Sequence, residues 1–202
     1  IGGISNATIV SIDELFSKDI GPGNCLIDSW VRKNSEKKYD HGGYLASIGE
    51  KNEIIFEQAQ ELYYNRNKEK KSFDTNDFDI SFSRGLSLED GTTTLTEFTG
   101  SIIAETISLL AKNGKIFNNI IICGGGRKNK VLMDVIQKNL TLKTKINMID
   151  DYGINGDFVE SKAFAFLAIR SYKKLPITFP STTNCNDCLL YTSDAADDVC
   201  CV

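Results

Sequence analysis

The chain has 202 residues, 41% of them hydrophobic, and a formal net charge of -4 at pH 7. That is enough for one domain with a real core, or for a large part of a two-domain protein. The lysines are scattered, so the basic footprint of a nucleic-acid binder is missing, and no stretch approaches the roughly 20 apolar residues of a membrane span. We therefore expect a soluble protein that binds neither nucleic acid nor membrane.

The first twelve residues predict a β-hairpin. An apolar run containing Gly2 and Gly3 leads to a polar corner at Ser5-Asn6, and β-branched residues follow up to Ile12. A bulge is the commoner reason for paired glycines in a strand. Because the chain opens on Ile1 and not on Met, we expect its natural start to lie farther upstream.

A carboxylate stands before a glycine-rich turn at Asp19 to Asn24, which reads Asp-Ile-Gly-Pro-Gly-Asn. Apolar residues recur at helical spacing from Leu26 to Val31, so the turn is predicted to lead from a strand into a helix. Pro22 fixes the turn, and Asn24 is a good N-cap. The simplest interpretation is a tight turn with a capping Asn. The alternative is a turn that aims backbone amides and one acid at a ligand.

The next segments predict structure more than chemistry. The cationic run at 32–38 is typical of a solvated loop, and we give no role to His41, the single histidine. Short and amphipathic helices are expected at Tyr44 to Ile48 and around 54–63, and a longer one of about 24 residues follows a capping box at Ser87 and Asp90. We expect that long helix to pack against a sheet.

Three glycines follow a strand near the middle of the chain. Ile120 to Ile122 is typical of a strand buried on both faces of a parallel sheet, and it leads through Gly124-Gly125-Gly126 into a helix near Lys130. Glycines before a helix N-terminus make a coherent anion or nucleotide site. The alternatives are an adenosine-contacting loop and simple close packing. The spacing is not that of a P-loop, because no Gly-Lys-Ser/Thr follows.

A last strand is expected near 145–149, and a turn at 153–157 leads into an apolar helix from Phe158 to Tyr172, expected to be buried. Glu160 lies in the first turn of this helix, where compensation of the helix dipole is its ordinary role. The alternating order of strands and helices predicts a three-layer α/β domain.

The six cysteines fall into two groups. Cys25 and Cys123 are solitary in apolar surroundings, typical of reduced thiols. The others crowd the tail at Cys185, Cys188, Cys200 and Cys201. A zinc site or a disulfide there is the weaker alternative, because the adjacent Cys200 and Cys201 make tetrahedral closure awkward. We expect residues 185–202 to be disordered and foreign to the rest of the chain.

Several motifs, in chain order, resemble segments of the anhydro-N-acetylmuramic acid kinases, members of the superfamily of sugar kinases, acetate kinase, Hsp70 and actin. The resemblance covers about residues 1–184 and ends before a tail that looks like a translated sequencing adapter. Two departures stand out: Ile20 replaces a Thr, and Thr75 replaces an Arg. The matching segments are Ile1 to Asn6, Asp19 to Asn24, Lys71 to Phe78, Cys123 to Met133 and Gly156 to Ala165.

The resemblance implies a role for each motif. Asp19 would be the catalytic base, and Asn24 and Glu160 would bind the sugar. The glycine hairpin would face the nucleotide phosphates, and the triple-glycine loop would bind adenosine. The residues implied for ATP are Gly2, Gly3, Gly124, Gly125, Gly126 and Asn129.

The resemblance also implies the fold and reaction. Residues 1–184 would be the second, actin-like (ribonuclease-H-like) domain of a two-domain cytoplasmic kinase whose first domain is missing here. With ATP and Mg²⁺ the whole enzyme would convert 1,6-anhydro-N-acetylmuramic acid, a small amino sugar, into N-acetylmuramic acid 6-phosphate, and no protein-bound metal site is expected. The oligomeric state is left open, a homodimer included. The alternatives are another sugar or acyl-phosphate kinase and a non-catalytic nucleotide-binding module.

Overall fold

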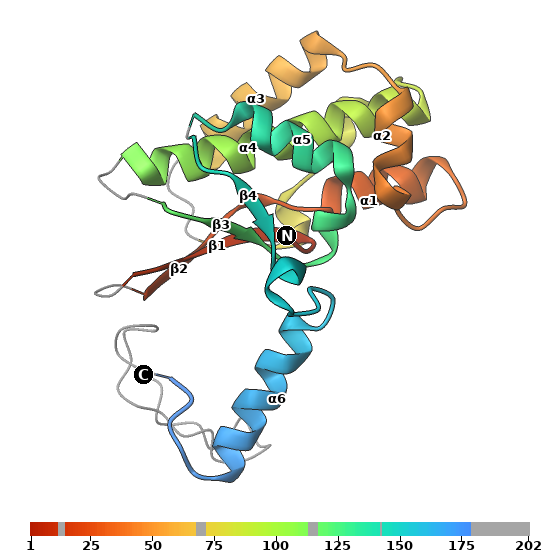
Figure 1. The fold of residues 1–202 in the computed structure, drawn as a ribbon. Helices are drawn as coiled ribbons and strands as arrows, with labels where there is room; N and C mark the ends of the chain where they lie inside the picture. The colour runs from red at the N-terminus through yellow and green to blue at the C-terminus, as the bar shows by residue number, and fades with distance from the viewer. Residues whose placement is uncertain (12–14, 68–71, 113–116, 142, 179–202) are drawn as a thin grey trace. The chain divides into compact units, whose positions relative to one another are not determined.

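The computed structural model describes residues 1–11, 15–67, 72–112, 117–141 and 143–178, which form a mixed α/β structure (Figure 1). Two compact units are present. The first comprises residues 1–7 and 18–156, and the second comprises 8–17 and 157–202. Within the described residues the strands form two two-stranded sheets. Short 3-10 helices lie at His41–Gly43, Thr75–Asp77, Ser81–Ser83, Gly125–Lys128 and Ile149–Tyr152.

Strands β1 (Ile4–Val10) and β2 (Leu15–Pro22) pair in the first sheet. So short a connection requires antiparallel strands. The predicted hairpin corner at Ser5-Asn6 is therefore wrong, because β1 runs straight through it. Ser5 is fully buried in the strand, where its hydroxyl donates to the carbonyl of Pro22 (2.9 Å), so this polar residue needs no turn.

Helix α1 (Cys25–Asn34) follows β2 and buries Leu26, Ile27, Trp30 and Val31, as its spacing predicts. Asn24 does occupy the N-cap position. Its backbone is already helical (φ -74°, ψ -10°), however, and its side chain makes no capping hydrogen bond. The prediction that the Asn24 side chain caps the helix is wrong, and that side chain is left for another contact.

Helices α2 (Tyr44–Ile48) and α3 (Glu53–Asn67) lie where the sequence places them, and Gly49 ends α2. The start of α2 is fixed by Asp40, whose buried carboxylate accepts from the backbone amides of Leu45 (2.8 Å) and Ala46 (3.1 Å). The loop before α2 thus owes its acidic residue to helix capping.

Helix α4 (Leu88–Lys112) has 25 residues and lies among the other helices of the first unit (Figure 1). One part of it packs with α1 and α3 around Leu95, Phe98 and Ile102. Another part meets strand residues, because Ile103 and Ala104 share a core with Ile20 and Ile122. The predicted contact with a sheet is therefore only part of its packing, because helices cover most of this helix.

Strands β3 (Ile120–Ile122) and β4 (Ile146–Met148) pair in parallel, with Ile120 opposite Ile146, and helix α5 (Lys130–Asn139) connects them on the chain. Asn129 caps α5, since its Oδ1 accepts from the amide of Leu132 (3.0 Å). Ile121 is 45% exposed, so the prediction of a strand buried on both faces is wrong. In this two-stranded sheet only one face has a core to cover it.

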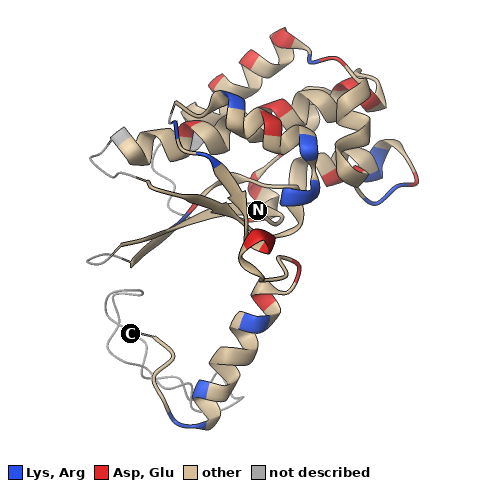
Figure 2. Ribbon diagram, viewed as in Figure 1, with Lys and Arg blue, Asp and Glu red and all other residues tan. Residues whose placement is uncertain are grey.

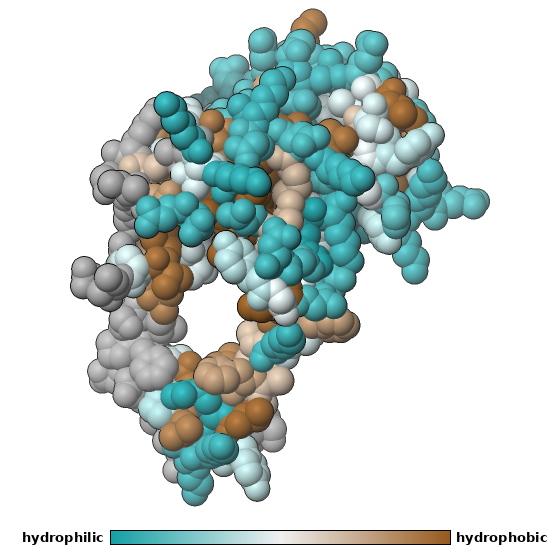
Figure 3. Space-filling view, in the orientation of Figure 1, coloured by the Kyte–Doolittle hydropathy of each residue, from teal (hydrophilic) through white to brown (hydrophobic). Residues whose placement is uncertain are grey.

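The second unit is described at its hairpin tip and at helix α6 (Val159–Tyr172). The helix forms where the sequence predicts it, but none of its residues is buried, and Phe164 is 65% exposed. Apolar side chains of α6 accordingly appear at the surface in Figure 3. The predicted burial is not met, because none of the described residues of this unit is buried, so they form no core against which the helix could pack. Residues 179–202, with the four tail cysteines, lie outside the described residues.

Candidate functional site

The glycine pair Gly2-Gly3 meets the turn at Gly23, which is distant in sequence, at the start of α1. The amides of Gly23 and Cys25 donate to the carbonyl of Gly3 (2.9 and 3.1 Å), and the amide of Asn24 donates to the carbonyl of Gly2 (2.7 Å). A Cβ added to Gly23 would collide with the carbonyl oxygen of Gly2. The turn after β2 thus requires glycine, because backbone packs directly on backbone there.

The triple-glycine loop closes on the same segment. The nitrogen of Ile1 donates to the carbonyl of Cys123 (2.7 Å), and the amide of Gly126 donates to the carbonyl of Ile1 (3.0 Å). Gly124 has φ +83°, and a Cβ on Gly126 would meet the Ile1 side chain. Both glycines are therefore structural.

Gly125 differs from its neighbours. The nearest atom to a Cβ built on it is Nδ2 of Asn24, 3.8 Å away, and its φ is not positive. The backbone of Gly125 thus faces open space beside the side-chain amide of Asn24, which makes no capping hydrogen bond. The structure brings Gly2, Gly3, Asn24 and the three glycines into one place, as a shared ligand would require.

An ion pair braces this loop. The Arg127 guanidinium donates to both carboxylate oxygens of Asp150 (2.6 and 3.0 Å), and the amide of Gly156 also donates to Asp150 (3.3 Å). The amide of Gly124 in turn donates to the carbonyl of Gly156 (3.3 Å). The pKa of Asp150 is lowered to about 2, mainly by the hydrogen bonds from the Arg127 side chain and next by the hydrogen bond from the amide of Gly156.

The Asp150 ion pair predicts a pH-dependent contribution to stability. A carboxyl whose folded-state pKa is depressed stabilises the fold above its ordinary pKa, and that contribution disappears as pH falls through the folded-state value. We expect Asp150→Asn to lower the urea midpoint at pH 7, with the difference from the parent vanishing between about pH 4 and pH 2. Asp134→Asn, the same change at an exposed site of α5, is the matched control. An equal deficit of Asp150→Asn at pH 7 and pH 2 would contradict the assignment.

Asp19 lies inside β2 and not in the turn, which begins only at Gly23. Its Oδ2 accepts from the hydroxyl of Ser72 (3.0 Å) and from the amide of Phe73 (2.9 Å). The segment after α3 thus reaches back to the candidate base. Sequence reasoning missed this contact, although the two segments belong to motifs singled out separately; Lys71 lies outside the described residues.

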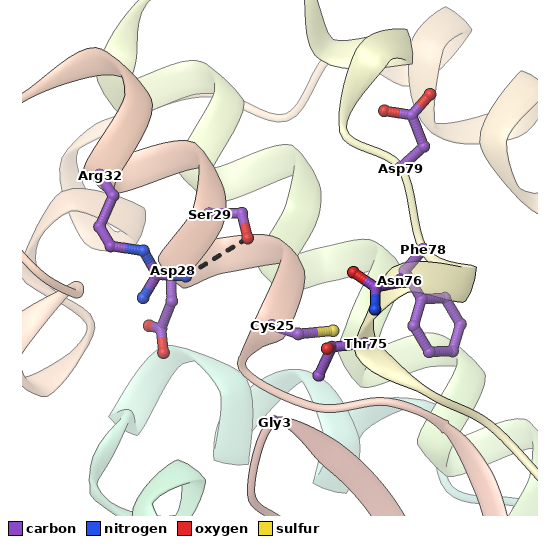
Figure 4. A pocket seen from close by; sticks show the side chains of 9 residues that line it. All are labelled: Gly3, Cys25, Asp28, Ser29, Arg32, Thr75, Asn76, Phe78 and Asp79. Atoms are coloured by element: carbon purple, nitrogen blue, oxygen red, sulfur yellow. Dashed lines mark hydrogen bonds between the residues drawn. The ribbon is translucent and has the colours of Figure 1, made fainter.

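A hollow of about 510 Å³ lies between α1 and the segment at 75–79 (Figure 4). Asp28, Ser29 and Arg32 line it from the helix, and Thr75 and Asn76 lie across from them. Burial raises the pKa of Asp28 although the nearby Arg32 opposes this. Nitrogen, oxygen and sulfur atoms face the hollow, so it suits a small polar group better than an apolar one.

The remaining predicted site residues lie elsewhere or are already engaged. Asn129 is 6% exposed, and its Oδ1 is taken by the N-cap of α5. Glu160 lies in the first turn of α6, in the second unit, so it is not among the residues brought together here. The roles of both remain predictions. Cys25 and Cys123 are free thiols, and burial raises the pKa of Cys25.

The distribution of charged, metal-ligating and apolar residues describes the rest of the molecule. Acidic residues predominate on α3 and α4, whereas α1 and α5 carry residues of both charges (Figure 2). Within the described residues no group of three His, Cys, Asp or Glu side chains could hold a metal ion. In the same part of the chain, no helix combines the length and the apolar content that crossing a bilayer demands.

A family model described as anhydro-N-acetylmuramic acid kinase matches residues 1–192. The chain belongs to this family. Relatives named anhydro-N-acetylmuramic acid kinase include proteins of Pelagibacter ubique strain HTCC1062, 48% identical over 190 residues, and Zymomonas mobilis, 36% identical over 185 residues. A Brucella canis relative of the same name is 36% identical over 189 residues.

The chain spans about half the length of the curated relatives it matches. The alignment with the Pelagibacter ubique protein covers 91% of this chain but 50% of that protein. The alignment with the Zymomonas mobilis protein covers 91% of this chain and 49% of that protein. Membership in the anhydro-N-acetylmuramic acid kinase family confirms the resemblance on which the candidate residues were chosen.

Proposed function

We propose that this chain is the catalytic, actin-like half of an ATP-dependent kinase that opens and phosphorylates 1,6-anhydro-N-acetylmuramic acid in the cytoplasmic recycling of cell-wall fragments. Residues 1–184 would form the second domain, and the other half of the protein would supply the first. One observation carries the proposal: three glycine segments that are distant in sequence meet at the turn that follows Asp19.

The nucleotide fits this meeting point. Gly125 leaves a space that a side chain would fill, and the Asn24 amide borders it. Unhindered backbone near a phosphate or adenosine group is what glycines provide. Mg²⁺ would be brought by the ATP phosphates, as is usual for this ion, and the described residues hold no cage of their own for it.

In this mechanism Asp19 takes a proton from a water that attacks the anomeric carbon of the sugar. The bond from that carbon to the bridging oxygen breaks, and that oxygen, which stays on C6, receives the γ-phosphoryl group of ATP while ADP leaves. Asn24 and Glu160 orient the sugar. Because phosphoryl transfer depends mainly on positioning and charge stabilisation, the two halves of the enzyme must enclose base, sugar and γ-phosphate together.

A hybrid protein tests the proposal. Residues 1–192 would be fused to the half of the Pelagibacter ubique relative that this chain does not cover. We expect ATP-dependent phosphorylation of 1,6-anhydro-N-acetylmuramic acid by the hybrid and by neither half alone, measured by mass spectrometry of the sugar product. Glucose, N-acetylmuramic acid and acetate form the comparison panel. Transfer to one of these in preference would favour another kinase of the superfamily, and ATP binding without any transfer would favour a non-catalytic module.

A further inference from the structure

We propose that Ser72 and the backbone amide of Phe73 act as a clamp that positions the Asp19 carboxylate for proton abstraction. Ser72 lies 53 residues beyond Asp19 in the chain, so no local pattern predicts their contact. The inference rests on the proposed function, since it gives the clamp the task of orienting the base.

Both donors of the clamp bind the same oxygen. The Ser72 hydroxyl (3.0 Å) and the Phe73 amide (2.9 Å) donate to Oδ2 of Asp19. Hydrogen bonds to an ionised group are stronger than those between neutral groups, so two of them restrain the orientation of the carboxylate. Within the part of the chain that the structure describes, no donor reaches Oδ1. That oxygen is therefore left to accept a proton, and its direction is set by the clamp.

The clamp is itself anchored to strand β2. The ring of Phe73 stacks on Tyr63 (centroids 6.4 Å apart, 26° between planes) and packs against Phe78 (5.4 Å). The Tyr63 hydroxyl donates to the carbonyl of Ile20, the residue after Asp19 (3.5 Å). Burial raises the pKa of Tyr63 to about 12, so its hydroxyl keeps its proton at neutral pH. Phe73 thus joins the strand through its amide and, by way of Tyr63, through its ring.

The residues that follow hold the clamp segment in a defined shape. Asp74 accepts from the amide of Asn76 (2.9 Å), and Asp77 accepts from the amide of Asp74 (2.6 Å), which completes a capping box. A segment restrained in this way by its own hydrogen bonds loses less conformational entropy when it packs on the strand. The contact with Asp19 is therefore built by three sets of interactions and not by an isolated surface serine.

The test uses Ser72→Ala and Ser72→Thr in the hybrid kinase. Small misplacements of a catalytic group cost up to about 100-fold in rate, and we expect loss of one of two donors to lower kcat about tenfold while the KM values for sugar and ATP stay within about twofold. Thr keeps the hydroxyl and should restore most of kcat. Ser47→Ala, at an exposed hydroxyl that donates to the carbonyl of Tyr44 (2.7 Å), should leave kcat unchanged.

The outcomes separate this inference from the proposed function. Parental kcat in Ser72→Ala, or failure of Ser72→Thr to recover it, overturns the clamp if Asp19→Asn is inactive in the same hybrid. A fall in kcat matched by a lower melting temperature would also overturn it, since that is the mark of a merely structural bond. Full activity of Asp19→Asn would instead overturn the assignment of the base.

Discussion

Asp19→Asn is expected to lower phosphorylation of the anhydro sugar by the hybrid kinase about 1,000-fold, because general-base catalysis contributes roughly 100- to 10,000-fold. Asn has nearly the same shape and can still accept hydrogen bonds from Ser72 and Phe73 through its side-chain oxygen. The clamp and the fold should therefore survive, while the group that takes the proton is lost. Single-turnover assays with saturating ATP and sugar would measure the effect on the chemical step.

Asp134→Asn is the matched control for Asp19→Asn. Asp134 is exposed on α5 and carries no proposed role, so the same change of charge there should leave kcat as it is. The melting temperature of each variant should match that of the parent. If Asp19→Asn retained near-full rate with sugar and ATP bound, another group would have to be the base.

Gly125→Leu is expected to raise the KM for ATP on the order of tenfold or more, which is about 1.4 kcal/mol or more of lost binding. Among the described residues, a Cβ at this position meets only Nδ2 of Asn24, at 3.8 Å, and the φ of Gly125 suits an ordinary residue. The chain should therefore fold as before, while the added side chain fills the space proposed for the nucleotide. Titration of the hybrid with ATP at saturating sugar would measure the change.

Gly126→Leu provides the contrast. A Cβ on Gly126 runs into the side chain of Ile1, so this variant should lose stability, and its melting temperature should fall. Overpacking of this kind costs about 1–3 kcal/mol. An unchanged KM for ATP in a well-folded Gly125→Leu protein would place the nucleotide elsewhere.

Much of the local structure could be predicted from the residues alone. Hydrophobic periodicity and capping residues predict helices α4 and α5 and the end of α2 at Gly49. The β-branched run predicts the parallel strand at Ile120 to Ile122. These signals act over a few neighbouring positions. Even so, local rules failed at Ser5-Asn6 and at Asn24. A strand partner satisfies Ser5 from across the sheet, and Asn24 has its amide bonded to Gly2, so neither behaves as an isolated turn residue would.

The candidate site shows the same division. The glycine motifs and Asp19 were visible as separate segments, but their spacing gave no reason for Gly2, Gly23 and Gly126 to meet. The partners of the charged groups were not visible at all: Ser72 for Asp19 lies 53 residues away, and Asp150 for Arg127 lies 23 residues away. Contacts of this length depend on how the helices pack, and no periodicity within one element encodes them.

By itself, the sequence determined most of the order of strands and helices, because turn residues and hydrophobic period act locally. Its motifs also carried the resemblance to the family, and that resemblance implied the glycines and the acid of the proposed chemistry. Only the tertiary structure decided that Gly125 alone of three glycines faces open space, that the side chain of Asn24 does not cap α1, and that Ser72 and Phe73 hold Asp19. Those facts depend on backbone atoms meeting across long stretches of chain, and such meetings are fixed by the packing of the whole unit.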